Sequence, residues 1–271
     1  MSSPFFDIVP ASFWRHRHLI WQMTRREVVG RYRGSWLGLL WSFFHPVLML
    51  AVYTFVFSVV FQARWGDGDG VNRAEFAIVL FAGLIIFNLF AEIVNRSPNL
   101  ILEHPNLVKK VVFPLEILPV VAAGSALFHA GVSLIVLLLF ELAVRHSLPA
   151  TALYLPLILL PFLTLTLGLS WLLASLGVYI RDVAQTVGIA TTALMFVSPI
   201  FFPLSALPEE IRPFLQLNPL ALIIEQARAV LVFGVGPAWT ALAGYGAMSL
   251  LGGLFGLWSF HKLRRGFADV L

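Results

Sequence analysis

The chain of 271 residues contains no cysteine, which excludes disulfide bonds, cysteine nucleophiles and thiolate metal ligands. It is also poor in charge, because 12% of its residues are charged while 59% are hydrophobic. A typical soluble domain has about 25% charged residues. The composition therefore indicates an integral membrane protein rather than a soluble enzyme or a soluble binding domain.

Several motifs of catalysis and cofactor binding are missing as well. No glycine is followed by lysine, so the G-K-[ST] end of a phosphate-binding P-loop is absent. No histidine is followed by glutamate, which removes the H-E-x-x-H zinc motif, and no serine lies in a G-x-S-x-G turn. We therefore expect no catalytic residue, no metal site and no cofactor in this chain.

Long apolar runs predict six transmembrane helices in a single all-α, polytopic domain that covers residues 1–271. About 20 apolar residues cross the hydrocarbon core as a helix, and each buried charge would cost several kcal/mol. The predicted spans are 37–61, 76–95, 117–140, 151–179, 184–202 and 239–260. In the last span Gly252 and Gly256 form a G-x-x-x-G pair, which favours close contact with another helix.

Residues 11–30 predict an amphipathic helix that lies in the membrane interface. At 100° per residue an apolar arc that includes Phe13, Trp14 and Trp21 faces away from most of the arginines. Such a helix places its tryptophans at headgroup depth and its arginines near anionic phosphates. A solvated helix packed on a partner subunit is the alternative.

Two further segments are too polar or too short to span. Residues 96–113 contain prolines and a cluster of charged residues, so the segment is too polar to span. We expect a short helix at 99–110 that lies across the cytoplasmic mouth of the bundle. Between residues 204 and 236 the apolar pieces are interrupted by prolines and charges. We expect short re-entrant helices there, at 211–233, which dip into the outer face.

The distribution of positive charge predicts the orientation. Six spans place both termini on one side, and that side carries 13 of the 18 Lys and Arg residues. The five others are Arg64, Arg73, Arg145, Arg212 and Arg228. The positive-inside rule therefore predicts cytoplasmic termini, and it explains the basic composition without nucleic acid as a partner. The first residues lack the apolar core and cleavage site of a secretion signal, so we expect none.

Four blocks of the sequence resemble, in order, the permease subunits of ABC-type polysaccharide exporters, most of all those for O-antigen and teichoic acid. The blocks are RYRGSWLGLLWSFFHPVLMLAVYTFVFS, VKKVVFPLEILPVV, GVYIRDVAQTVGIATTALMFVSPIFFP and LQLNPLALIIEQARAVL. The resemblance runs from about Arg25 to the end of the chain. It implies a homodimer in the bacterial inner membrane and two cytoplasmic ATPase subunits that hold ATP and Mg²⁺. It also implies export of polyprenyl-pyrophosphate-linked polysaccharide, as in lipopolysaccharide biosynthesis, through a channel between protomers.

The same resemblance assigns roles to particular segments. Its cytoplasmic coupling helix falls on 99–110, its interfacial helix on 11–30 and its re-entrant outer helices on 211–233. The residues that would then meet the ATPase are Asn99, Glu103, His104, Asn106, Lys109 and Lys110.

Two sets of side chains are candidates for contact with the substrate. Guanidinium groups pair well with phosphate at the membrane surface, although anchoring to lipid headgroups explains the same arginines. These are Arg25, Arg26, Arg31 and Arg33. Sugars stack on aromatic rings, so a row of rings would let a glycan slide, although rings also pack against lipid and neighbouring helices. The candidate rings are Trp36, Trp41, Tyr53, Phe57, Phe196, Phe201 and Phe202.

A self-sufficient membrane transferase, or a secondary carrier for lipid-linked sugars, is the alternative function. A transferase should have clustered acidic residues near one membrane face, but Glu92 and Glu103 each stand alone in the sequence. A carrier should have internal repeats with matching broken helices, and we find no convincing repeat. Both observations favour the exporter subunit.

Overall fold

The computed structural model describes residues 13–56, 73–108, 113–203, 208–210, 215 and 218–271, and no strand occurs among them. Five helical segments in this part of the chain are long and apolar enough to cross a membrane. They are Gly38–Val56, Ala74–Asn99, Ile117–Arg145, Ala150–Tyr179 and Trp239–Val270. A sixth apolar helix, Val183–Val197, is shorter. The all-α, multi-pass prediction is therefore confirmed.

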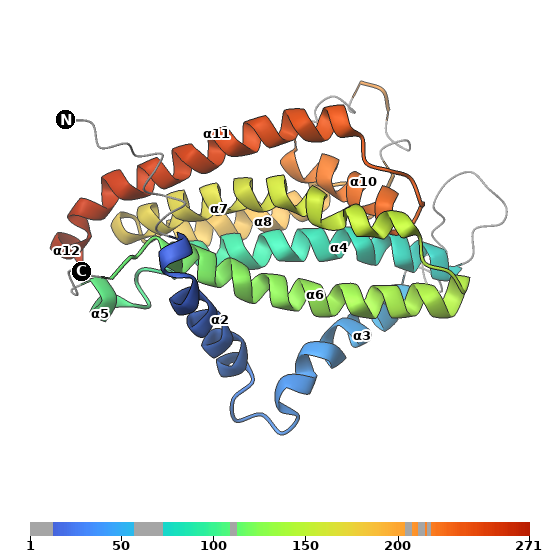
Figure 1. The fold of residues 1–271 in the computed structure, drawn as a ribbon, viewed down its shortest axis with the longest axis horizontal. Coiled ribbons are helices and arrows are strands. Elements are labelled where there is room, and N and C mark those ends of the chain that lie inside the picture. The colour runs from blue at the N-terminus through green and yellow to red at the C-terminus, as the bar shows by residue number, and fades with distance from the viewer. Residues whose placement is uncertain (1–12, 57–72, 109–112, 204–207, 211–214, 216–217) are drawn as a thin grey trace.

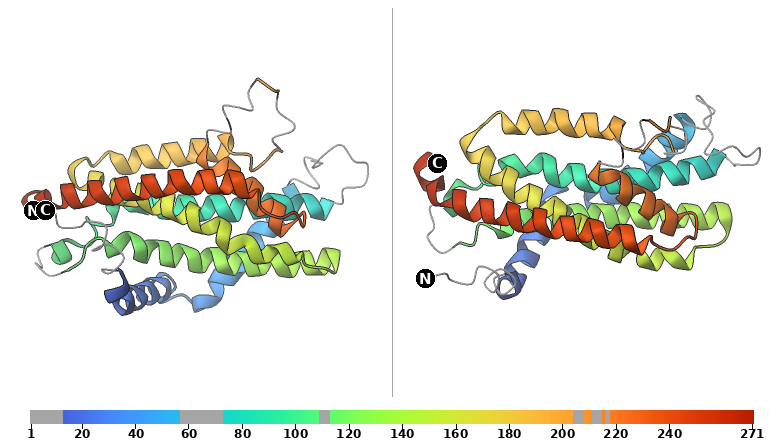
Figure 2. Two further views of the ribbon diagram at one scale, coloured as in Figure 1. Left: turned by 45° about the horizontal axis from the view of Figure 1, so that its top comes forward. Right: turned by 90° about the horizontal axis from the view of Figure 1, so that it is seen from above.

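The long helices run side by side and surround a central one (Figures 1 and 2). The central helix is α4 (Arg73–Arg96), which lies between α6 (Ile117–Arg145) on one side and α7 (Leu155–Tyr179) and α8 (Val183–Val197) on the other. Between Phe76 and Phe87 it is apolar around its whole circumference, so this half can be enclosed on all sides. Ala77, Ile78 and Leu80, for example, have no exposed surface.

The outer helix α11 (Trp239–Leu263) packs on α7 through glycines. A Cβ atom added to Gly168 would lie 2.5 Å from the carbonyl oxygen of Gly252, and one added to Gly256 would overlap the carbonyl oxygen of Gly168. The two backbones therefore touch directly, which only glycine permits. The close contact expected of the G-x-x-x-G pair is confirmed, and the partner helix is α7.

Most helix boundaries lie close to the predicted ones, with differences at the ends of α6 and α8. Helix α6 continues to Arg145, whereas the predicted span ends at 140. Helix α8 is shorter than predicted. This helix ends at Val197, whereas the predicted span continues to 202. Ser198 is extended, with ψ of 149°, and Pro199 follows it. A residue before proline is disfavoured in the helical conformation, and proline itself lacks the N–H that the next turn would need.

A buried arginine fixes α10 (Pro219–Leu231), the helix that lies toward the opposite end of the bundle from the C-terminus (Figure 1). Arg228 has no exposed surface. It donates hydrogen bonds to the carbonyl oxygens of Val79 (3.0 Å), Pro199 (2.5 Å) and Ile200 (2.7 Å). Burial lowers the pKa of Arg228 to about 10, so it remains charged at neutral pH. The side chain therefore ties α10 to α4 and to the end of α8.

The amino-terminal helix α2 (Arg17–Arg31) and α3 (Trp41–Tyr53) form a V beside the bundle (Figure 1). The apolar arc expected for residues 11–30 is divided between two environments. Phe13 stacks on Trp171 of α7, with 5.9 Å between ring centroids, and Val28 is buried. Trp14 and Trp21 are 72% and 68% exposed. Residues 11, 12 and 57–61, which belong to the predicted interfacial helix and first span, lie outside the described residues.

The segment that links α4 to α6 contains short turns rather than one helix over 99–110. A 3-10 turn, η3 (Ser97–Asn99), is followed by the four-residue helix α5 (Pro105–Val108). Its start is held by a 2.6 Å hydrogen bond between the hydroxyl groups of Ser97 and Ser170. Its end is held by Arg264, which donates to the Glu116 carboxylate at 2.8 Å. Both contacts tie the segment to the α7–α11 pair.

Candidate functional site

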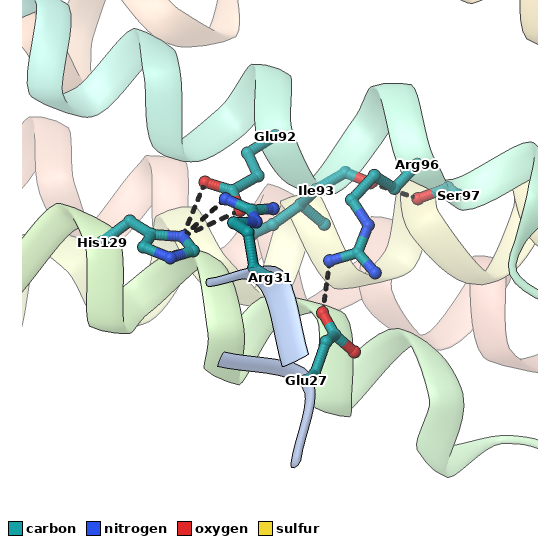
Figure 3. A network of polar contacts seen from close by, with 7 residues as sticks. All are labelled: Glu27, Arg31, Glu92, Ile93, Arg96, Ser97 and His129. Carbon is teal, nitrogen blue, oxygen red and sulfur yellow. Dashed lines mark hydrogen bonds and ion pairs between the residues drawn. The ribbon is translucent and has the colours of Figure 1, made fainter. Parts of the chain in front are cut away.

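Two reciprocal ion pairs join α2 to α4 (Figure 3). Helix α2 contributes Glu27 and Arg31, and α4 contributes Glu92 and Arg96. Residues four positions apart lie on the same face of a helix, so each helix presents one acid and one base to the other. Nη2 of Arg31 lies 2.7 Å from Oε1 of Glu92, and Nη1 of Arg96 pairs with Oε1 of Glu27.

A histidine from α6 completes the cluster. Nδ1 of His129 lies 3.0 Å from Oε1 of Glu92 and 3.0 Å from Nη1 of Arg31. This nitrogen can donate to the carboxylate when protonated or accept from the guanidinium when it is not. The side chains of Glu92 and His129 are only 20% and 15% exposed. We call these three residues, Arg31, Glu92 and His129, the charge cluster.

The charge cluster opens into a cavity of about 680 Å³ between α3, α4 and α6. Its polar and aromatic lining comprises the charged groups of the cluster with Arg96, the rings of Trp41 and Tyr53, and the amides of Asn88 and Asn95. Apolar side chains, among them Met49, Ile85 and Leu89, line the rest. Guanidinium groups bind oxyanions, while rings and amides bind the faces and hydroxyl groups of sugars. The cavity therefore has the chemistry to hold a polar, anionic ligand next to a glycan.

The four arginines expected to meet headgroups are not equivalent. Arg31 is in the charge cluster, although its side chain is still 41% exposed. Arg25, Arg26 and Arg33 are exposed on α2 and on the turn that follows it. Beside Arg31, burial raises the pKa of the Tyr32 phenol above its ordinary value of 10, so this hydroxyl group stays neutral at neutral pH.

The candidate rings fall into separate groups. Trp41 and Tyr53 line the cavity, whereas Trp36 is 96% exposed in the turn before α3. Phe196 of α8 is 62% exposed and stacks on Phe201 at 6.0 Å between centroids. Phe202 is partly buried, and Phe57 lies outside the described residues. Among the described residues, Trp41 and Tyr53 line the cavity beside α3, whereas Phe196 lines a separate hollow beside α8.

The residues expected to meet an ATPase lie at the end of the bundle that also holds α12 (Phe267–Val270) (Figure 1). Glu103 and Asn106 are exposed, and Asn99 is partly buried. His104 is partly buried, and its Nδ1 lies 3.0 Å from the carbonyl oxygen of Leu100. Lys109 and Lys110 lie outside the described residues. The described members thus include an exposed acid and an exposed amide at this end.

Sequence reasoning missed the charge cluster. Glu92 was considered only as an acid without neighbouring acids in the sequence, whereas the structure pairs it with Arg31 from α2 and His129 from α6. A signal does exist in the sequence, because the pattern E-[VI]-V-[GN]-R occurs twice, as EVVGR from Glu27 and as EIVNR from Glu92. Two helices with the same acid-to-base spacing can pair in reciprocal fashion, whereas His129 carries no comparable pattern.

Comparison with known proteins matches residues 18–232 to the family described as ABC-2 type transporter. The O-antigen export system permease protein RfbA of Myxococcus xanthus is 30% identical over 219 residues, which cover 80% of this chain and 81% of that protein. The protein of the same name from Klebsiella pneumoniae is 26% identical over 252 residues, 92% of this chain and 93% of that protein.

A third relative comes from Neisseria meningitidis serogroup B. This capsule polysaccharide export inner-membrane protein CtrC is 24% identical over 228 residues, covering 80% of this chain and 82% of that protein. The family match extends over α2 from residue 18 onward, the charge cluster, the segment between α4 and α6, and α10. The chain therefore belongs to the ABC-2 type transporter family.

Proposed function

We propose that this chain is the membrane permease of an ATP-driven exporter that moves polyprenyl-pyrophosphate-linked polysaccharide of the O-antigen type out across the inner membrane. The observation that carries the proposal is its similarity, over most of both chains, to export permeases for O-antigen and capsule polysaccharide. Permeases of the ABC-2 family have no ATPase domain of their own. ATP and Mg²⁺ therefore bind to a separate partner subunit, and this chain supplies the path.

In the proposed topology α8 is the fifth of six spans and both termini are cytoplasmic. The 15 residues of α8 measure about 22 Å as a helix, against roughly 30 Å of hydrocarbon. The turn after Val197 would complete the crossing, because the carbonyl oxygens of Pro199 and Ile200 are satisfied by Arg228 rather than left bare in lipid. The excess of Lys and Arg at the terminal end supports the orientation.

The coupling segment at this end is proposed to receive the ATPase. Glu103 and Asn106 are exposed there, and the segment is fastened to α7 through Ser97 and to α11 through Arg264. A push on the segment would therefore reach the α7–α11 pair, whose glycine contacts leave little room for compression. This gives a physical route from ATP hydrolysis to helix movement.

The channel is proposed to form between two copies of this chain. The exposed rings of the segment Gly38–Val56 support this arrangement, since Phe43 and Phe44 of α3 and Phe55 just after it are 40%, 41% and 59% exposed. A second copy would bring further rings to the side of the cavity that holds Trp41 and Tyr53. Arg25, Arg26 and Arg33 would attract the anionic headgroup to the cytoplasmic surface, and Arg31 would meet it at the cavity.

Affinity purification of the tagged chain from its host in mild detergent tests the proposal. We expect a P-loop ATPase to be recovered in stoichiometric amount, and Glu103→Lys to lose the ATPase or to uncouple its hydrolysis from export. Glu210→Lys is the matched control, because Glu210 is an exposed acid outside the coupling segment. Purification of the chain alone, even after cross-linking, would sink the exporter assignment and favour the self-sufficient transferase or carrier.

The proposed lining can be mapped separately. Because the chain has no cysteine, single cysteines at positions 41, 53 and 196 can be labelled with a membrane-impermeant thiol reagent without background. We expect labelling at 41 and 53 to be slowed by bound substrate. Equal labelling with and without substrate at all three positions would place the path elsewhere.

A further inference from the structure

The charge cluster has the geometry of an anion site that is already occupied by one of the protein's own side chains. The Glu92 carboxylate lies 2.7 Å from Arg31 at the edge of a cavity lined by rings and amides. We propose that Glu92 is a built-in competitor for Arg31, and that the phosphoanion of the lipid-linked substrate displaces it during loading. This inference rests on the proposed function and specifies how its headgroup site is regulated.

Carboxylate and phosphate groups bind to the same edge of the arginine guanidinium. Both accept charge-assisted hydrogen bonds from the guanidinium edge, so one can replace the other. Arg31 remains accessible for such a replacement, since its side chain is 41% exposed while that of Glu92 is 20% exposed. A ligand that enters the cavity therefore reaches the guanidinium without the backbone of α4 having to move.

His129 can keep a hydrogen bond to the Glu92 carboxylate after a ligand has displaced it from Arg31. A half-buried carboxylate that loses its partner is costly, because it has given up water without gaining another hydrogen bond. Nδ1 of His129 lies 3.0 Å from Glu92 Oε1 and equally close to Arg31 Nη1. When Arg31 turns to a phosphate, Nδ1–H can keep the bond to Glu92. The exchange therefore replaces one set of paired charges by another.

The ion pair between Arg96 and Glu27 holds α2 in place during the exchange. Arg96 pairs with Glu27, one turn before Arg31 on α2. Arg31 is the last residue of α2, which leads into the turn toward α3 (Figure 1). Release of Arg31 would therefore free the turn between α2 and α3, while the Arg96–Glu27 pair keeps the rest of α2 joined to α4. Binding of an anion would in this way change the position of α3 at the wall of the cavity.

The experiment measures binding of farnesyl diphosphate to the purified full-length chain in detergent, by tryptophan fluorescence or calorimetry. Glu92→Gln keeps the size of the side chain and removes the competing charge, so we expect about tenfold tighter binding. Arg31→Gln should weaken binding at least tenfold, and Arg31→Lys should fall between, because lysine keeps the charge without the fork. Each variant is first checked for a monodisperse elution profile.

Glu75→Gln is the matched control. Glu75 is also a partly exposed acid on α4, paired with Arg145 at 3.5 Å, but it does not line the cavity. We expect its affinity to equal that of the parent chain. The decisive variant is the double change Arg31→Gln with Glu92→Gln, in which the gain from Glu92→Gln should vanish. An equal gain with and without Arg31 would mean a general field effect and would overturn the competitor role.

Separate arms identify the source of the phosphoanion. Inorganic pyrophosphate tests the headgroup alone, and nanodiscs with or without phosphatidylglycerol test bilayer lipid. Tightening by Glu92→Gln for farnesyl diphosphate, with weaker binding of the other two, supports the substrate headgroup. Displacement of farnesyl diphosphate by phosphatidylglycerol would overturn that assignment in favour of bilayer lipid. If the ATPase is recovered but Glu92→Gln changes no affinity, the proposed function stands and this inference falls.

Discussion

The α7–α11 pair and the α2–α3 limb are held to the molecule in different ways. In the first, Gly168 faces Gly252 and Gly256, so the two backbones touch at this point. In the second, two ion pairs join α2 to α4, while Thr24 of α2 packs closely on Gly124 of α6. Helix α3 buries Ser42, Pro46 and Leu50, and most of its larger side chains are exposed. The first contact is fixed by shape alone, whereas the second also depends on charges that can exchange partners.

This difference suggests a division of labour. A glycine contact has no rotamers and tolerates almost no compression, so it suits the part that would transmit force from the coupling segment. Ion pairs next to a cavity can be broken and replaced by a ligand's charges, so they suit the part that would sense and admit a substrate. Four experiments, described in order of falling effect on stability, test whether the two regions differ in this way.

The largest effect is expected at the glycine contact. Gly256→Ala places a methyl group against the carbonyl oxygen of Gly168 and must push α11 away from α7, which should cost about 2 kcal/mol or more. The thermal unfolding midpoint in detergent measures it. Gly244→Ala on the same helix is the control, because its Cβ would meet nothing within 4 Å. Equal midpoints for both variants would refute the idea of a rigid pair.

The next effect is expected at the buried arginine of α10. Arg228→Gln removes charge-assisted hydrogen bonds to the buried carbonyl oxygens of Val79, Pro199 and Ile200, a loss of roughly 2 kcal/mol at most. Glu225→Gln should cost much less, since those three bonds remain. Unfolding midpoints compare the two variants, and similar losses would assign the effect to the ion pair instead.

A smaller effect is expected at the ion pair between Glu27 of α2 and Arg96 of α4. A double-mutant cycle of Glu27→Gln and Arg96→Gln should give a coupling energy of about 1 kcal/mol, because both side chains are only partly exposed. The exchanged pair Glu27→Arg with Arg96→Glu should recover most of the stability that either single reversal loses. No recovery would mean that α2 is held by apolar contacts such as that of Phe13 with Trp171.

The smallest effect on stability is expected at Trp36. This residue is 96% exposed in the turn between α2 and α3, so Trp36→Ala should leave the unfolding midpoint unchanged. Export of polysaccharide in cells should nevertheless fall if the ring belongs to the proposed aromatic track. Normal export would remove Trp36 from that track while leaving Trp41 and Tyr53 as its candidates.

The sequence by itself determined the membrane class, the helical fold and the main helix boundaries. These follow from local properties, since a bilayer selects apolar runs of a given length and proline disfavours the continuation of a helix, although α3 and α7 contain Pro46 and Pro161. The end of α8 at Val197 is of this kind, because Pro199 could have predicted it. The pair Gly252 and Gly256 also predicted a close helix contact, although nothing in the sequence identified Gly168 as its partner.

Only the tertiary structure decided how charged residues far apart in the sequence are used. Arg31, Glu92 and His129 come from three helices, and their distances depend on how those helices pack. Arg228 was counted with the outer charges, yet it is fully buried because Gly83 leaves room for it and backbone carbonyl oxygens satisfy its donors. Hydrophobicity is a property of each segment, whereas the pairing of a buried charge is a property of its neighbours.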